Sequence, residues 1–176
     1  MPSTLLLGGA RSGKSALAVD MGERRAGAGQ QVVVIATATT SDDDMADRIA
    51  AHRKHRPDWP TIEESVDLAA ALRSTPADAF VIVDCLTLWV ANLMWRGDAD
   101  EAIEALAAQS AQIAAGLDTV VVSNEVGLGV HPPSELGRRY RDLLGRVNAR
   151  WAATADRSLL LVAGRALPLT DPWELL

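Results

Sequence analysis

The sequence contains a single cysteine, no long hydrophobic run and no excess of basic residues. One cysteine, Cys85, excludes an intramolecular disulfide framework. No apolar run approaches the roughly 18 residues that a membrane-spanning helix needs. The first residues, Met1-Pro2-Ser3-Thr4, lack the basic region of a secretory signal, and the net charge of −6 argues against a general nucleic-acid surface. We therefore expect a cytoplasmic protein without a nucleic-acid partner or a membrane span.

Length and composition favour one globular domain over residues 1–176. The 176 residues are 48% hydrophobic, which is enough for a sizeable core in a single domain. Most notably, basic residues gather at 48–56 and 138–150 and do not form a long tail. Short basic clusters fit a compact anionic ligand better than an extended polyanion.

Five short runs rich in Val, Ile and Leu predict strands that are buried on both faces. These runs lie at residues 4–7, 31–36, 80–84, 119–123 and 158–163. Longer helical patterns separate them, including one over 98–117, and further edge strands remain open. Such alternation is typical of an α/β fold, in which a mainly parallel sheet is flanked by helices.

The clearest helix is predicted to begin near Ser134. Apolar residues recur every three or four positions and form one stripe, while the opposite face is rich in arginine. The stripe consists of Leu136, Tyr140, Leu143, Val147 and Trp151.

A phosphate-binding motif follows the first predicted strand. The octapeptide matches G-x-x-x-x-G-K-S/T in full and consists of Gly8, Gly9, Ala10, Arg11, Ser12, Gly13, Lys14 and Ser15. The glycines permit a loop whose amides face phosphates, Lys14 reaches the outer phosphates, and the Ser15 hydroxyl can ligate Mg²⁺. A glycine-rich turn that fits by chance is disfavoured by the strand before it and the helix after it. The motif predicts a P-loop NTPase.

Asp84 ends the third predicted strand and is the expected Walker B carboxylate, which holds Mg²⁺ directly or through water. Its alternative role is to cap the next helix. The neighbouring Cys85 is expected to be a small core residue and not a nucleophile. Asn124 and Glu125 follow the fourth strand, where they either orient substrate or water or form the turn before Gly127. The sequence leaves these two roles open.

Residues 42–57 carry a second motif, with acids in the first turn of a predicted helix and Pro57 as its stop. Helical spacing brings Arg48, His52 and Arg56 near one face. Flanking cations would lower the pKa of His52 and keep it neutral, the form that acts as nucleophile or base. Composition alone favours a packed histidine without chemistry. No spacing resembles a zinc site, so Mg²⁺ is the metal that the residues imply.

Taken together, these blocks resemble the bifunctional adenosylcobinamide kinase / adenosylcobinamide-phosphate guanylyltransferase family over nearly the whole chain. The matching blocks are residues 8–15, 35–37, 43–45 with Arg48, Ile49 and His52, 56–57 with Trp59, 83–89 with Asn92 and Leu93, 122–129, 141–142 and 145–148. The P-loop is shared with many unrelated NTPases. The His52 segment and residues 123–127 are far more specific.

The resemblance implies two reactions in cobalamin (vitamin B12) biosynthesis and salvage. Adenosylcobinamide is phosphorylated with ATP or GTP, and GMP is then transferred from GTP to give adenosylcobinamide-GDP. The transfer passes through a guanylylated histidine, which matches His52 and reverses the interpretation from composition. The resemblance also implies a RecA-like core and a homotrimer.

The candidate site combines these implications with the motifs. Lys14 and His52 are the catalytic candidates, and Ser15 and Asp84 are the metal candidates. Nucleotide contacts are expected from residues 8–15 and from Thr37, Arg53, Lys54, His55, Arg56, Glu63 and Asp84. The cations would neutralise charge on the phosphates.

Two other functions fit the P-loop alone. One is a small-alcohol or nucleoside kinase without a covalent nucleotide, and the other is a RecA-like, nucleotide-switched ATPase. The chain departs from the family pattern at 130–135, which is one residue longer than expected, and at its tail, residues 171–176.

Overall fold

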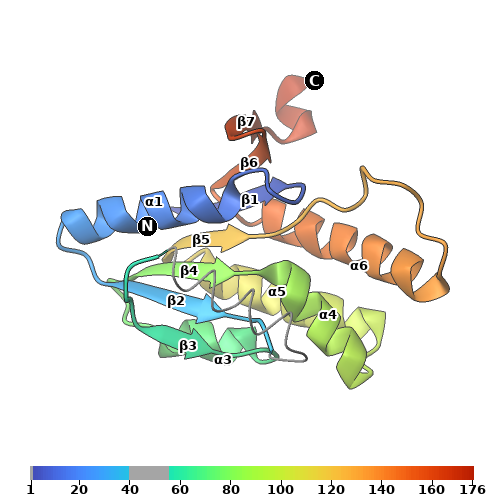
Figure 1. Cartoon of the computed structure of the whole chain (residues 1–176), viewed down its shortest axis with the longest axis horizontal. Coiled ribbons are helices and arrows are strands. Elements are labelled where there is room, and N and C mark those ends of the chain that lie inside the picture. The colour runs from blue at the N-terminus through green and yellow to red at the C-terminus, as the bar shows by residue number, and fades with distance from the viewer. Residues whose placement is uncertain (1, 40–55) are drawn as a thin grey trace.

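The structure is a computed structural model and describes residues 2–39 and 56–176. Seven strands and six helical segments are defined in the described part of the chain (Figure 1). The strands are β1 (Ser3–Gly8), β2 (Val32–Ala36), β3 (Thr61–Glu63), β4 (Phe80–Asp84), β5 (Asp118–Val122), β6 (Arg157–Val162) and β7 (Arg165–Leu169). The helices are α1 (Lys14–Gly27), α3 (Leu68–Ser74), α4 (Leu86–Arg96), α5 (Asp100–Ala114), α6 (Glu135–Ala152) and the 3-10 helix η1 (Pro172–Leu175).

All strands join one sheet in the order β3-β2-β4-β5-β1-β6-β7. Every neighbouring pair is parallel except β6 and β7, which are antiparallel. The strand that leads into the P-loop, β1, is separated from the strand that ends at Asp84, β4, by β5 alone. The prediction of a mainly parallel α/β sheet with a RecA-like core is confirmed.

The five predicted strands are all present, and two edge strands add to them. β3 has three residues and little apolar burial, so no hydrophobic run marks it. β7 contains Pro168, and all five of its residues are exposed. Proline is tolerated in edge strands, where a missing backbone donor need not break the ladder. The predicted helix over 98–117 is shorter than expected and ends at Ala114.

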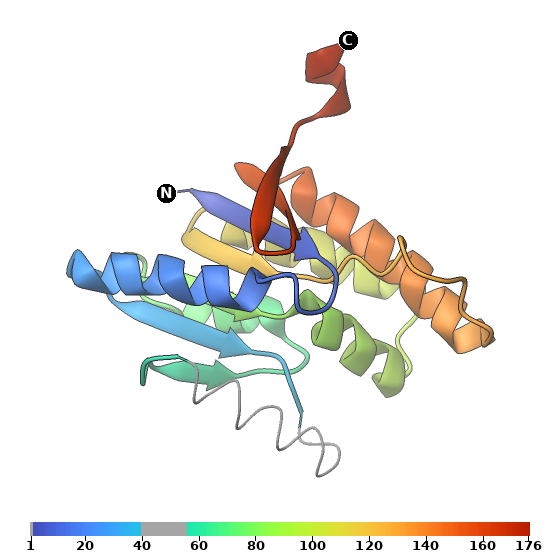
Figure 2. The ribbon, with the colours of Figure 1, turned by 45° about the horizontal axis from the view of Figure 1, so that its top comes forward.

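Strand alternation divides the core between the two faces of the sheet. Leu5 and Leu7 of β1 pack with α3, α4, α5 and α6 on one face. Leu6, between them, packs with α1 on the other face. Figures 1 and 2 show the same division, and both show β7 and η1 projecting from the rest of the molecule. Because β1 to β6 pair in parallel, their carboxyl ends lie at one edge of the sheet.

Helix α6 begins as predicted, because the Ser134 hydroxyl caps it by accepting a hydrogen bond from the Gly137 amide at 3.1 Å. Leu143, Val147 and Trp151 are buried in the core. The prediction for Leu136 is wrong, since this side chain is 58% exposed in the first turn, ahead of the part of the helix that meets the sheet.

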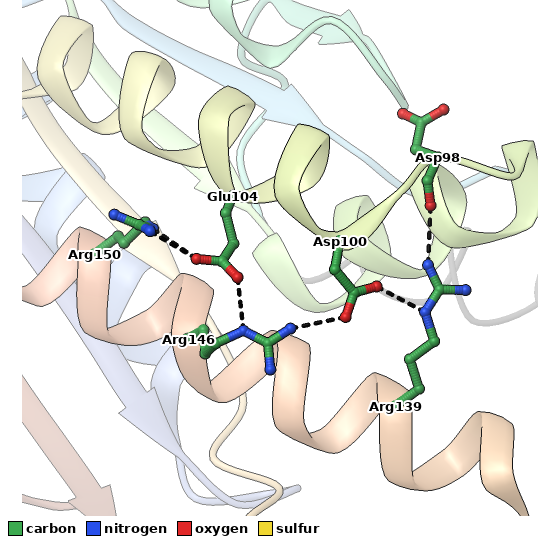
Figure 3. A network of polar contacts seen from close by, with 6 residues as sticks. All are labelled: Asp98, Asp100, Glu104, Arg139, Arg146 and Arg150. Atoms are coloured by element: carbon green, nitrogen blue, oxygen red, sulfur yellow. Dashed lines mark hydrogen bonds and ion pairs between the residues drawn. The ribbon is translucent and has the colours of Figure 1, made fainter.

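The arginine-rich face of α6 is turned toward α5 (Figure 3). Arg139 and Arg146 both bind Asp100, at 2.7 and 2.8 Å. Arg146 and Arg150 both bind Glu104 at 2.7 Å. This cluster, which we call the α5–α6 ion-pair network, neutralises much of the basic cluster at 138–150 within the chain, so these arginines are not a ready anion site. Among the described residues, none of the helices has the length and apolar character needed to cross a membrane.

Candidate nucleotide-binding site

The P-loop connects the end of β1 to the start of α1, and two of its glycines, Gly8 and Gly13, adopt positive φ angles that other residues rarely adopt. Gly8 has φ 149° and Gly13 has φ 102°. A Cβ atom on Gly8 would lie 2.4 Å from the Leu161 carbonyl oxygen of β6. Because the loop packs this closely on the sheet, its backbone amides stay at the carboxyl edge.

The side chain of Lys14 folds back over this loop. Its Nζ atom donates to the carbonyl oxygens of Gly8 and Gly9, at 2.8 and 2.7 Å, and to the Ser12 hydroxyl at 3.3 Å. Lys14 is only 6% exposed. Burial lowers the pKa of Lys14, while the negative charges of the Cys85 thiolate, where it forms, and of Asp84 oppose that shift. A phosphate that reaches this loop would therefore meet a desolvated ammonium group.

Residues after β5 run between the P-loop and Asp84. Val122 is paired with Leu6 of β1 on one side and with Asp84 of β4 on the other. Beyond the ladder, the Glu125 amide donates to the Gly8 carbonyl at 3.1 Å. The sheet thus brings together the two sequence motifs that are about 70 residues apart in the chain.

The oxygen donors at this edge fit Mg²⁺. Ser15 lies in the first turn of α1, and Asp84 is partly buried at the end of β4. Hydroxyl and carboxylate oxygens are hard ligands of the kind that Mg²⁺ prefers, with nucleotide phosphates and waters completing the shell. Within the described ranges, no group of three or more His, Cys, Asp or Glu side chains could hold a metal.

Thr37 lies at the same edge, but its side chain is occupied by internal bonds. It is fully buried, and its hydroxyl donates to the Cys85 carbonyl at 2.7 Å and accepts from the Cys85 amide at 2.9 Å. Asn92 donates to the Thr37 carbonyl at 2.8 Å. Thr37 thus joins the end of β2 to the start of α4, and its contact with a nucleotide stays a prediction.

Cys85 behaves as the sequence predicts. Burial, with the negative charge of Asp84, raises the pKa of the Cys85 thiol to about 11. The thiol therefore stays protonated near neutral pH, which does not favour a nucleophile.

The structure separates the two roles that the sequence left open for Asn124 and Glu125. Glu125 Oε1 accepts a hydrogen bond from the Gly127 amide at 2.7 Å, so this side chain forms the turn. The backbone of Asn124 is held instead by two other side chains, Thr87 and Asn148. Glu125 is therefore the turn residue, and Asn124 has its side chain left for another use.

The remaining candidates lie toward β3 or outside the described residues. Arg56 donates from Nη2 to the hydroxyl of Thr61, the first residue of β3, at 2.9 Å. Glu63 ends β3, in register with Ala36 of β2. The other candidates of the predicted histidine segment lie outside the described residues, because they fall within 40–55. They are His52, Arg53, Lys54 and His55.

One contact of the P-loop was missed by sequence reasoning. The Gly164 amide, in the turn between β6 and β7, donates to the Ser12 carbonyl at 2.9 Å. The Ala163-Gly164 pair between two strands is a two-residue hairpin turn, which a search for turn residues could have found. Its contact with the P-loop depends on the order of the strands, which no local pattern reveals.

Comparisons with known proteins agree with this geometry. The chain matches, over residues 4–169, the family described as cobinamide kinase / cobinamide phosphate guanyltransferase. It is 45% identical over 175 residues to the "Bifunctional adenosylcobalamin biosynthesis protein CobP" of Pseudomonas aeruginosa, covering 94% of this chain and 95% of the relative. It is 39% identical over 176 residues to the "Bifunctional adenosylcobalamin biosynthesis protein CobU" of Escherichia coli, covering 91% of this chain and 95% of the relative.

A solved structure extends the likeness to the fold. The flagellar accessory protein FlaH from Methanocaldococcus jannaschii superposes with a TM-score of 0.54 at 14% identity, covering 96% of this chain and 78% of FlaH. At this identity the likeness concerns the fold alone. The sequence match, by contrast, spans the P-loop, the Asp84 strand and α6, and on this basis the chain belongs to the cobinamide kinase / cobinamide phosphate guanyltransferase family.

Proposed function

We propose that this protein phosphorylates adenosylcobinamide with ATP or GTP and then transfers GMP from GTP to the new phosphate. The product is adenosylcobinamide-GDP, in cobalamin biosynthesis and salvage. The observation that carries the proposal is a complete P-loop facing Asp84 in a chain of this family. The nucleotide substrates are consistent with the cytoplasmic location expected from the sequence.

In the kinase step, the acceptor hydroxyl oxygen forms a bond to the γ-phosphorus, and the bond from that phosphorus to the bridging oxygen breaks. The hydroxyl proton leaves to water. The loop amides and Lys14 bind the phosphates and neutralise the charge that spreads over their oxygens. Lys14 must exchange its bonds to the Gly8 and Gly9 carbonyls for bonds to phosphate.

Ser15 and Asp84 are the residues that would hold Mg²⁺, which neutralises phosphate charge when bound. Asp84 also lies close enough for its charge to act on Lys14. The charge of Asp84 opposes part of the lowering of the Lys14 pKa that burial causes, and so favours the cationic form that can bind phosphate.

In the transferase step, a neutral His52 attacks the α-phosphorus of GTP, a P–N bond forms and pyrophosphate leaves. A phosphate oxygen of adenosylcobinamide phosphate then attacks the same phosphorus and releases His52. Two displacements at the α-phosphorus thus replace a single direct transfer from GTP. The second displacement is favoured because the imidazole is a good leaving group from the phosphoramidate. The support for His52 is the family resemblance of its segment together with this chemistry.

The transferase step is tested by incubating the protein with Mg²⁺ and GTP labelled on its α-phosphate, followed by denaturation and peptide mapping. We expect an acid-labile, base-stable GMP adduct on His52, and none in His52→Ala. His131→Ala is the matched control, because that histidine lies on the surface beside Arg141 and should leave the adduct intact. An active preparation without an adduct would contradict the covalent step and favour a P-loop kinase.

The kinase step is tested by transfer of the γ-phosphate of ATP or GTP to adenosylcobinamide. His52→Ala should keep most of this activity while losing guanylyl transfer. Equal loss of both activities in folded His52→Ala protein would contradict the assignment. Nucleotide hydrolysis that needs no acceptor and yields no phosphorylated corrinoid would favour the nucleotide-switched ATPase.

We also propose a homotrimer, as the family resemblance implies. The segment that projects from the molecule in Figure 2 carries exposed apolar side chains, including Leu167, Trp173 and Leu175. Exposed apolar clusters of this kind are typical of interaction surfaces. Light scattering should give a mass of about three times the 18.7 kDa of one chain, and a monomer at micromolar concentration would contradict the proposal.

A further inference from the structure

Asn124 lies just after β5, at the sheet edge that also carries the P-loop and Asp84. It follows β5, the strand that separates β1 from β4. Its neighbour Glu125 donates its amide to the Gly8 carbonyl of the P-loop at 3.1 Å. The amide of Asn124 itself donates to the hydroxyl of Thr87, in the first turn of the helix after Asp84, at 3.0 Å. Asn124 is therefore bracketed by the two phosphate-site motifs.

The backbone of Asn124 is held from both sides by buried side chains. Asn148 of α6 is 4% exposed and donates from Nδ2 to the Asn124 carbonyl at 3.0 Å. The same Asn148 accepts from the fully buried Ser123 hydroxyl at 2.6 Å, which fixes the orientation of its amide. Buried polar networks of this kind are costly unless they are complete, and complete ones hold one conformation. Helices α4 and α6 thus position a single residue at the edge of the sheet.

The side chain of Asn124 takes no part in this network. It is partly buried, and in the described part of the chain it makes no hydrogen bond. Its neighbour differs, because the Glu125 carboxylate forms the turn with the Gly127 amide. The amide side chain of Asn124 therefore remains available for a ligand at this edge.

We propose that the Asn124 side-chain amide donates a hydrogen bond to the γ-phosphate as it is transferred, and that Asn148 is the positioning residue that holds Asn124 in place. This inference rests on the proposed kinase step. Lys14 and Asp84 supply charge at the site, whereas Asn124 supplies a neutral amide donor on a backbone that Thr87 and Asn148 hold in place. A donor in a fixed place stabilises the charge that develops on the equatorial phosphate oxygens without reorganising during the reaction.

The test compares Asn124→Ala with Glu125→Gln in kinase assays with ATP and adenosylcobinamide. Loss of one fixed donor should lower the kcat of Asn124→Ala by about 100-fold, with a much smaller change in the Kd for ATP. Glu125→Gln keeps an acceptor for the Gly127 amide, so it should retain wild-type kcat. A kcat for Asn124→Ala near that of the wild type would overturn the inference. So would a loss of ATP binding in proportion to the loss of kcat.

Asn148→Asp tests the positioning role. The carboxylate can still accept from Ser123 but cannot donate to the Asn124 carbonyl, so kcat should fall by less than in Asn124→Ala. In the double variant the two losses should not multiply, because both act through one contact. Multiplying losses would overturn the positioning role.

A second readout separates this inference from the proposed function. Slow hydrolysis of ATP without an acceptor transfers the same γ-phosphate to water, so Asn124→Ala should slow it by a similar factor. Wild-type protein that hydrolyses ATP but never phosphorylates the corrinoid would contradict the proposed function and leave the Asn124 comparison measurable. Unchanged hydrolysis in folded Asn124→Ala would overturn the inference alone.

Discussion

Two charged regions of this protein differ in what their charges do. The α5–α6 ion-pair network has three arginines between two helices, and their side chains remain 39 to 49% exposed (Figure 3). At the P-loop edge, by contrast, the cation Lys14 is only 6% exposed. The arginines are neutralised by fixed carboxylates, whereas Lys14 is held mainly by carbonyl oxygens that a phosphate can replace.

The comparison shows that the number of charges does not mark the site. Exposed ion pairs are screened by water and contribute about 0 to 1 kcal/mol each. A desolvated cation interacts more strongly with an incoming anion, because less water shields it. We therefore expect substitutions at the P-loop edge to affect activity and substitutions in the network to affect stability slightly.

The largest effect is expected from Lys14→Met. Kinase activity should fall by about 1,000-fold or more, because the charge on the phosphates loses its central cation. The same change removes a charge that burial disfavours, so the apoprotein should unfold at no lower temperature than the wild type. Steady-state kinetics and thermal unfolding measure the two quantities. Full activity in Lys14→Met would erase the distinction between the regions.

The next effect compares two aspartates, one from each region. Asp84→Asn should lower kinase kcat by about 100-fold and raise the Mg²⁺ concentration needed for half-maximal rate, because the proposed metal ligand loses its charge. Asp100→Asn makes the same carboxylate-to-amide change in the α5–α6 ion-pair network. It should leave kinase kcat and the Mg²⁺ concentration for half-maximal rate unchanged. A Mg²⁺ titration of the three proteins decides the matter, and equal defects would contradict the assignment of Asp84.

A pH-dependent effect is expected at the P-loop edge. Because the folded pKa of Cys85 is raised to about 11, the unfolded chain releases this proton first as pH rises. The contribution of Cys85 to the free energy of unfolding is therefore fully present below pH 9. It falls by roughly 2 kcal/mol as pH rises toward 11. The contribution of Lys14 to stability changes with pH in the opposite direction. Because its pKa is lowered in the folded protein, the folded state releases this proton first as pH rises, and stability from this group increases.

Urea unfolding of wild type and Cys85→Ala between pH 8 and 11 separates these terms, because Lys14 is common to both proteins. Wild type should lose more stability than Cys85→Ala across this range. If the free energies of unfolding of the two proteins changed with pH in parallel, that result would contradict the raised pKa of the buried Cys85 thiol.

The smallest effect is expected from Arg146→Ala, which removes bonds to both Asp100 and Glu104. The free energy of unfolding should fall by about 1 kcal/mol or less, and the difference should shrink in high salt. Kinase kcat should match the wild type. A 10-fold loss of kcat would show that the network also serves the site.

Local signals explain which elements the sequence could predict. Each of the five strands is a contiguous apolar run, because strands buried on both faces need apolar residues throughout. Ser134 was identifiable as a helix start because a cap acts within three residues. β7 escaped prediction, since an exposed edge strand with Pro168 carries no such run.

Site residues divide in the same way. Lys14 and Asp84 could be named as candidates because each belongs to a motif whose chemistry is contained in a few neighbouring residues, and their roles stay predictions. The roles of Asn124 and Glu125 could not be distinguished, since both are polar residues after a strand. Their difference depends on Thr87 and Asn148, which lie 37 and 24 residues away from Asn124 in the chain.

The sequence by itself determined the P-loop, the buried strands and the family to which this chain belongs, because these depend on the order of residues along the chain. Only the tertiary structure decided that β5 separates the P-loop from Asp84 and that the arginines of α6 bind α5. It also decided that Glu125 forms a turn while the Asn124 side chain stays available. The physical reason is that burial and hydrogen-bond partners depend on which distant segments pack together, and the order of strands sets that packing.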